Sequence, residues 1–313
     1  MLRWMRRVSL LAALALVLAA CGGGLNEDKS GGGSSSGSGT KKNVTIKLAS
    51  NDFTEQLILG EIYRQVLTGK GYTVDYKAKL GPREIVAPAL ESGQINMYIE
   101  YAGSARAILA KKTDKADQAK ILEDLKAFYA PKNITPLDPS PMSDQNAFAV
   151  TQATAEKYGS NLEQVAPKAG ELIVGGPPEC EQRATCLKGI QDAYGVKFKQ
   201  FRPIAQGALK YQALLKGDIQ IALAFTTDGI ISKEGLVLLE DPKGVFPPDN
   251  AIPVVRNDLL QQGGDTLKAD INAISAKITT PEITKLNAAV DIDHKDPEEV
   301  ATEWVKAQGL VTS

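Results

Sequence analysis

The first forty residues divide this chain into a part that can fold and a part that cannot. Three arginines precede an almost unbroken apolar run, residues 8–20, which ends in small residues directly before Cys21. A basic start, an apolar run of about 13 residues and small residues before a cleavage point are typical of an export signal, and such a run is too short to span a bilayer comfortably. We therefore predict a signal peptide over residues 1–20.

Cys21 and the segment after it predict an anchor and a tether. The sequence LAAC, which ends at Cys21, resembles a bacterial lipobox, in which the cysteine is lipidated and the chain is cut just before it. An ordinary secretory signal with an incidental cysteine is the alternative. The Gly- and Ser-rich stretch within residues 21–42 has too few apolar side chains to fold and behaves as a flexible coil. We expect an extracytoplasmic protein, lipid-anchored to the outer face of the cytoplasmic membrane or held in the periplasm.

The remaining composition limits what the body can be. From residue 43 onward roughly 270 residues remain, which exceeds one ordinary hydrophobic core and favours two lobes. The chain has 36 basic and 37 acidic residues, without the basic excess of a nucleic-acid-binding protein. It has one histidine, His294, which argues against a His-based metal site and a Ser-His-Asp triad. We expect no metal and no cofactor.

The two other cysteines, Cys180 and Cys186, are close together in the sequence. In an oxidising exterior, such a pair predicts a disulfide that closes a small loop. A redox or metal-binding pair is the alternative, but the spacing differs from CxxC and no additional ligands accompany it.

Strand-like and helix-like segments alternate along the body. Periodicity predicts helices from residue 57 to 67, 187 to 194 and 207 to 216, with Asn51 or Asp52 capping the first of them. The last segment, 258–310, is predicted to be mainly helical. This alternation is typical of α/β lobes built on mostly parallel sheets, whose ligands bind outside the carboxyl ends of the strands. The predicted strands are 44–49, 72–76, 94–99, 147–150, 172–176, 198–201, 219–225, 236–240 and 253–256.

Several ordered sequence blocks carry a family resemblance over essentially all of residues 43–313. Together they resemble the substrate-binding proteins of osmoprotectant ABC transporters, the receptors for glycine betaine, carnitine and choline. The blocks are ASNDFTEQ at 49–56, ALESGQI at 89–95, YIEYAGS at 98–104, GPPE at 176–179, FTTDG at 225–229, LEDPKG at 239–244, FPP at 246–248 and DPEEVA at 296–301.

The resemblance implies a type II periplasmic-binding fold with two crossover strands at a hinge. Residues 43–146 and 251–313 would form the first lobe, and residues 147–250 the second. Such a monomeric receptor closes around its solute and delivers it to a membrane permease powered by a separate ATPase. It implies no enzymatic activity.

The resemblance also assigns residues to the solute. Quaternary ammonium groups have no N–H to donate and are recognised by aromatic faces, whereas a betaine carboxylate needs donors such as arginine or a hydroxyl. The matching positions are Asn51, Tyr101, Ser104, Arg183 and Phe225. Four of these positions have a structural alternative: Tyr101 and Phe225 as core, Ser104 as the cap of a helix starting at Ala105, and Arg183 as a solvated loop charge.

Two positions depart from the aromatic cage of the family. Asn146 and Asp249 stand where aromatic residues are frequent. A carboxylate at 249 suits any cation, methylated or not, so we predict weaker or broader recognition. Tyr98 is interpreted as structural, and Asp228 is left between a role across the hinge and a helix cap.

Other functions remain open at this point. The site also suits a receptor for another small polar amine or amino acid, and a lipoprotein scaffold with a degenerate cleft is a further alternative. An enzyme that has reused the two lobes is disfavoured by the single histidine and by the lack of a free thiol once Cys180 and Cys186 pair.

Overall fold

The computed structural model describes residues 42–310. The predicted signal peptide, Cys21 and nearly all of the predicted tether lie outside these residues. No helix within 42–310 is long and apolar enough to cross a membrane.

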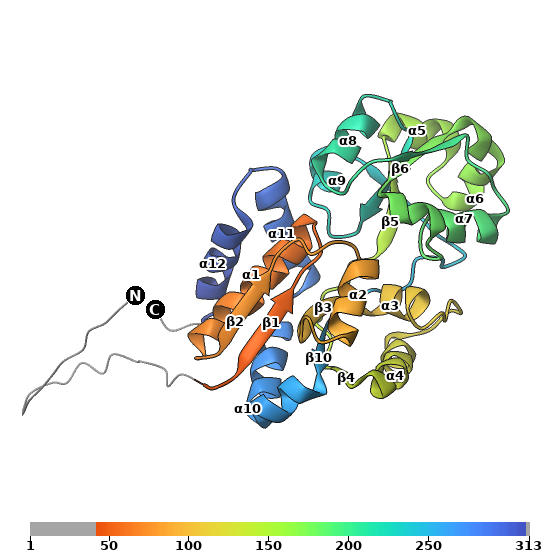
Figure 1. The fold of residues 1–313 in the computed structure, drawn as a ribbon. Helices are drawn as coiled ribbons and strands as arrows, with labels where there is room; N and C mark the ends of the chain where they lie inside the picture. The colour runs from red at the N-terminus through yellow and green to blue at the C-terminus, as the bar shows by residue number, and fades with distance from the viewer. Residues whose placement is uncertain (1–41, 311–313) are drawn as a thin grey trace, which may run out of the picture. The chain divides into compact units, whose positions relative to one another are not determined.

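The first lobe is a five-stranded sheet with the helices that pack on it (Figure 1). Its strand order is β2-β1-β3-β10-β4, and only β10 runs against the other strands. The strands are β1 (Thr45–Ala49), β2 (Thr73–Lys77), β3 (Met97–Tyr101), β4 (Ile134–Pro136) and β10 (Ala251–Arg256), and the α-helices are α1 (Thr54–Gly69), α2 (Arg83–Glu91), α3 (Ala102–Ile108), α4 (Gln118–Tyr129), α10 (Asn257–Ser275), α11 (Thr280–Asp291) and α12 (Pro297–Ala307).

The second lobe repeats this plan. Its strand order is β7-β6-β8-β5-β9, and β5 takes the place of β10 as the one reversed strand. The strands are β5 (Asn146–Val150), β6 (Ile173–Gly176), β7 (Gln200–Pro203), β8 (Ile221–Phe225) and β9 (Val237–Leu239), and the α-helices are α5 (Gln152–Tyr158), α6 (Leu162–Val165), α7 (Leu187–Tyr194), α8 (Ala208–Leu215) and α9 (Ile230–Lys233).

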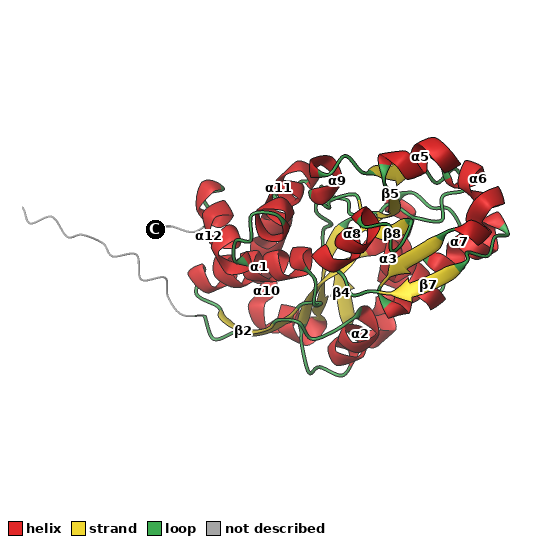
Figure 2. Ribbon diagram, turned by 90° about the horizontal axis from the view of Figure 1, so that it is seen from above, coloured by secondary structure: helices red, strands yellow, loops and turns green. Residues whose placement is uncertain are grey.

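Both sheets are buried on two faces, as Figure 2 shows by the helices on either side of the strands. In β1, Ile46 and Leu48 join one hydrophobic cluster and Ala49 joins another. In β5, Phe148 and Ala149 divide in the same way between two further clusters. Alternate side chains point to opposite faces of a strand, and the central strands β3 and β8 are buried along nearly their whole length, whereas β1 keeps Thr45 and Lys47 exposed, in keeping with the alternating pattern of 44–49.

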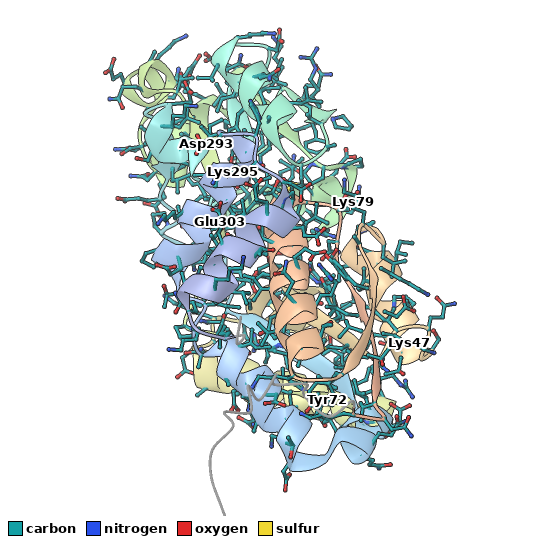
Figure 3. All side chains as sticks on the ribbon, turned by 90° about the vertical axis from the view of Figure 1, so that its left-hand side faces the viewer. Lys47, Tyr72, Lys79, Asp293, Lys295 and Glu303 are labelled. Atoms are coloured by element: carbon teal, nitrogen blue, oxygen red, sulfur yellow. A yellow bond between two sulfur atoms is a disulfide. The ribbon has the colours of Figure 1, made fainter. Side chains whose placement is uncertain are left out.

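The C-terminal helices close one face of the first sheet. In Figure 3, α1 lies beside α11 and α12, and an ion pair between Lys295 and Glu303 (3.1 Å) marks the outer surface there. Pro281 and Pro297 both lie in the first turn of their helices, where a missing N–H costs nothing.

Two connections join the sheets and run side by side. Ser143 and Asn250 form an antiparallel bridge, and the amide of Asp144 donates to the carbonyl of Asp249 (2.9 Å). These are the two crossover strands expected at the hinge.

Some local predictions were wrong. The strand predicted over 94–99 is Met97–Tyr101. Asn96, directly before it, bonds β1 through its side chain: its Oδ1 accepts from the Lys47 amide (2.7 Å) and its Nδ2 donates to the Thr45 carbonyl (3.1 Å). The strand predicted over 198–201 is Gln200–Pro203. Helix α4 and strand β4 were not predicted.

The predicted caps were also wrong. Helix α1 begins after Phe53 without a side-chain cap. Ser104 lies inside α3, which begins at Ala102 directly after β3, so it caps no helix at Ala105.

Candidate functional site

One cavity between the lobes gathers every residue that the sequence assigned to the solute. Its lining comes from the ends of β1, β3 and β8, from the start of β5, and from the loops beside them. The assigned residues that line it are Asn51, Tyr101, Ser104, Asn146, Arg183, Phe225 and Asp249. The cavity thus lies where ligands of α/β sheets are expected, outside the carboxyl ends of the parallel strands.

Equivalent positions of the two sheets meet in this cavity. Tyr101 ends β3 and pairs with Ala251, while Phe225 ends β8 and pairs with Asn146. Because β3 and β8 occupy the same place in the two strand orders, the two aromatic residues are topological equivalents. The relation is absent from the sequence, which shows no internal repeat.

Tyr101 is both core and cavity wall. The ring packs into the core of the first lobe with 5% exposure, and its hydroxyl donates to Glu55 Oε1 (2.6 Å). Glu55 also accepts from Thr227 Oγ1 (2.6 Å) and Asn287 Nδ2 (2.8 Å). Burial raises the pKa of Glu55, although these three bonds act against the rise. The motif at 49–56 contained Glu55, but the sequence gave no reason to single it out.

Thr227 makes one of the polar contacts between the lobes. Its hydroxyl lies 2.6 Å from Glu55 Oε2 and 2.7 Å from Asp144 Oδ1. Burial, and then the neighbouring Glu55, raise the pKa of Asp144 well above its ordinary value. One hydroxyl proton serves two buried carboxyl groups here, which favours a protonated Asp144. No sequence signal pointed to this trio.

Asp249 is a buried carboxyl group rather than part of an aromatic cage. It accepts from the amide of Ser104 (3.0 Å) and from its hydroxyl (2.5 Å). Burial raises the pKa of Asp249 to about 7, with the Ser104 hydroxyl acting in the opposite direction. The group therefore changes charge near neutral pH.

Asn51 is held in place by two neighbours. Its Nδ2 donates to the carbonyl of Gly81 (2.7 Å), and its Oδ1 accepts from the Tyr98 hydroxyl. These bonds explain why Asn51 does not cap α1. Tyr98 is 1% exposed and holds the Asn51 side chain through this hydrogen bond, in keeping with its interpretation as a structural residue.

Arg183 crosses between the lobes. Its Nε and Nη2 donate to the two carboxylate oxygens of Glu84 in α2 (3.1 and 2.8 Å), and Glu179 lies 3.7 Å from Nη1. Burial raises the pKa of Glu84, but the contact with Arg183 outweighs it and the net shift is downward. The alternative of a solvated loop charge does not hold, because the guanidinium makes a two-bond ion pair to the other lobe. The sequence did not identify Glu84.

The loop that carries Arg183 is closed by a disulfide between Cys180 and Cys186, as predicted. Asn146 Nδ2 donates to the carbonyl of Thr185 in the same loop (2.7 Å). Asn146 therefore fixes the loop as well as lining the cavity.

Asp228 belongs to the second lobe and makes no contact across the hinge among the bonds found in 42–310. It accepts from the amide of Phe225 (2.9 Å) and from the Tyr211 hydroxyl, and Lys210 Nζ lies 3.6 Å away. Lys210 is 1% exposed, and burial lowers its pKa. Sequence patterns alone did not indicate a buried lysine here.

No three His, Cys, Asp or Glu side chains within residues 42–310 are arranged to hold a metal ion. The cavity instead combines the buried carboxyl groups of Asp144 and Asp249 and the rings of Tyr101 and Phe225 with the guanidinium groups of Arg83 and Arg183.

A two-lobed α/β body with a polar and aromatic cavity at its hinge defines a solute-binding protein. Residues 44–307 match the family model of the substrate-binding domain of ABC-type glycine betaine transport systems, and the chain belongs to this family. The family consists of extracytoplasmic receptors that work with ABC permeases.

Relatives agree over nearly the whole body. The glycine-betaine-binding protein of Pseudomonas aeruginosa is 29% identical over 286 residues, which cover 88% of this chain and 91% of that protein. The glycine betaine-binding protein YehZ of Escherichia coli is 28% identical over 277 residues, covering 84% and 90%. A crystal structure described as a glycine betaine/carnitine/choline ABC transporter superposes with a TM-score of 0.68 at 29% identity, covering 86% of this chain and 99% of that one.

Proposed function

We propose that this protein is the extracytoplasmic receptor of an ABC importer for a small quaternary ammonium or zwitterionic osmoprotectant of the glycine betaine, choline and carnitine class. One observation carries the proposal: Tyr101, Phe225 and the buried Asp249 line a single cavity at the hinge of the two lobes. The names of the relatives support the same solute class.

The cavity suits a cation without N–H groups. Aromatic rings attract a methylated ammonium through their negative faces, and the apolar methyl groups gain from leaving water. A carboxylate close to the rings adds Coulombic attraction, which is stronger in a buried site than in water. A zwitterionic solute also requires a hydrogen-bond donor for its carboxylate, and Arg183 is our candidate for this donor.

The cavity also differs from a purely aromatic box. Asn146 and Asp249 replace rings with polar groups, and Asp249 attracts any ammonium, methylated or not. We infer broader and weaker recognition than that of a strict betaine site, with Asn51, Tyr101, Ser104, Asn146, Arg183, Phe225 and Asp249 as solute-binding residues.

The site supports a receptor rather than an enzyme. We propose a monomer, lipid-anchored through Cys21, that delivers its solute to a permease and its ATPase. The lobes would be residues 43–146 with 251–313, and residues 147–250. The Gly- and Ser-rich tether would keep the receptor within reach of the permease and raise its effective concentration there.

Calorimetry with glycine betaine, choline, carnitine and proline betaine tests the proposal. We expect binding of more than one of them with similar affinities. Tight binding of a single compound that leaves Asn146 and Asp249 uninvolved would contradict the broad site, and no binding of any of them would contradict the solute class.

A second candidate, a receptor for another small polar amine or an amino acid, is favoured by the carboxylate of Asp249. Native mass spectrometry of protein purified without added solute separates the two candidates, because the mass of a retained compound identifies its class.

A further inference from the structure

Phe53 stands between two cavities of the cleft. The solute cavity described above and a second cavity share four lining residues, Phe53, Asp144, Gln206 and Phe225. The second cavity is also lined by Lys210, Asp228 and Asp291. Phe53 precedes α1 directly, with extended backbone angles (φ −128°, ψ 157°).

The ring of Phe53 forms the middle of a three-ring stack. Its centroid lies 6.2 Å from that of Tyr101, with 30° between the planes, and 5.9 Å from that of Phe225, with 12° between the planes. These are contact distances for aromatic pairs. A trimethylammonium group therefore has no room between the rings, and the stack acts as a continuous wall.

The far side of this wall carries a positive charge. Lys210 Nζ lies 5.0 Å from the ring centroid of Phe225 and 4.8 Å from that of Tyr211, and it donates to Gln206 Oε1 (2.9 Å). The ring of Phe225 thus stacks on Phe53 and also lies beside the ammonium of Lys210. Phe53 and Phe225 line both cavities, whereas Tyr101 lines the solute cavity alone.

We propose that Phe53 is a specificity-determining residue that separates the solute cavity from the cavity of Lys210. The ring limits the length of the solute that fits, and it keeps a cationic solute away from the ammonium of Lys210. This inference rests on the proposed solute class and adds a size limit to it.

Two substitutions of Phe53 distinguish the effect of its side-chain volume from that of its aromatic ring. Phe53→Ala removes the partition, so choline should lose roughly fivefold or more in affinity, about the worth of one aromatic contact, while the longer carnitine should lose less. The ratio of the carnitine Kd to the choline Kd therefore falls. Phe53→Leu keeps most of the bulk, so both solutes should weaken together and the ratio should stay close to that of the wild type.

Titration calorimetry of the three proteins with choline and carnitine measures these ratios. A fall in the ratio for Phe53→Ala alone supports the partition. An equal change in the ratio for Ala and Leu, or no change in either, overturns it.

A crystal structure of Phe53→Ala gives a readout that needs no solute. We expect one continuous cavity from Asn146 to Asp291, and two separate cavities would overturn the partition. If the wild-type protein binds neither choline nor carnitine, the proposed solute class fails, while the crystal structure still decides the partition. If Phe53→Ala does not fold, the structure of Phe53→Leu and its ratio of carnitine Kd to choline Kd decide instead. Leucine retains most of the bulk, so a fall of this ratio in Phe53→Leu would contradict the size limit.

Discussion

The two lobes share one scaffold but stabilise their cleft residues by different means. At the hinge, Asp249 accepts from Ser104 after β3, and its topological equivalent Asp144 accepts from Thr227 after β8. In each crossover strand, therefore, an aspartate side chain accepts from a hydroxyl group. That hydroxyl belongs to a residue shortly after the central strand, β3 in the first lobe and β8 in the second.

The loops around this common frame differ. In the first lobe, Arg83 at the start of α2 donates to both carboxylate oxygens of Glu100 in β3 (2.8–3.0 Å), and Glu100 Oε1 also accepts from the amide of Tyr101 (2.7 Å). In the second lobe, residues 177–186 separate β6 from α7, and a disulfide closes them. The first lobe thus ties the start of α2 to β3 by a buried ion pair, whereas the second lobe orders the loop between β6 and α7 by a disulfide.

Breaking the ion pair should have the largest effect. Arg83 and Glu100 have side-chain exposures of 8% and 0%, so Glu100→Ala leaves a buried charge without a partner. We expect a loss of about 3–5 kcal/mol in the free energy of unfolding, measured in urea. The control is the double variant Arg83→Met/Glu100→Leu, which should recover most of the loss; an equally unstable double variant would contradict this account.

Removing the disulfide should have the next largest effect. Cys180→Ser/Cys186→Ser frees a short loop in the unfolded chain, for which chain entropy predicts a loss of about 2 kcal/mol. Solute affinity should fall as well, because the loop carries Arg183. Identical urea midpoints for oxidised and reduced protein would show that the hydrogen bond from Asn146 is enough to hold the loop.

Arg183 tests whether the second lobe clamps a carboxylate. Arg183→Ala should weaken glycine betaine by about 1.5 kcal/mol, the low end for charge-assisted bonds, because Glu84 already holds the guanidinium. Choline has no carboxylate and should be nearly unaffected. Glu84→Ala is the matched control and should strengthen glycine betaine only. Equal losses of both solutes in Arg183→Ala would leave Arg183 as an interlobe ion pair alone.

The smallest expected effect is a pH dependence from Asp249. A fixed positive charge favours the ionised carboxyl group, so choline affinity should rise severalfold as the pH increases through about 7. The slope should flatten in Asp249→Asn, measured by calorimetry at pH 6, 7 and 8. A slope that persists unchanged in Asp249→Asn would assign the titration to Glu55 or Asp144.

The Asp249 carboxyl group should affect the free energy of unfolding in the opposite direction, lowering it as the pH rises. Its folded-state pKa lies above the ordinary value of 3.8, so the folded protein binds more protons than the unfolded chain in this range. The contribution of Asp249 to the free energy of unfolding should therefore decrease as the pH rises from about 4 to about 7. Urea unfolding of the wild type and of Asp249→Asn over this range measures the difference.

Much of the molecule follows from local patterns in the sequence. The length of the body predicted two lobes, and the alternation of strands and amphipathic helices predicted their α/β class, since strands and half-buried helices have different periodicities. Four of the seven predicted solute-binding residues, Asn51, Tyr101, Ser104 and Phe225, occur in the sequence blocks at or just after strand ends, and the structure brings all seven to one cavity. The pairing of Cys180 with Cys186 followed from their short separation.

The rest depends on contacts between segments far apart in the chain. Glu55, Asp144 and Thr227 meet only because the lobes meet, and Glu84 faces Arg183 across the cleft. The ring of Phe53 stacks on the rings of Tyr101 and Phe225, which are far from it in the sequence. The sequence determines which side chains stand at strand ends, because that is local periodicity; the tertiary structure decides which of them share protons, charges and ring faces, because those interactions extend over only a few ångströms.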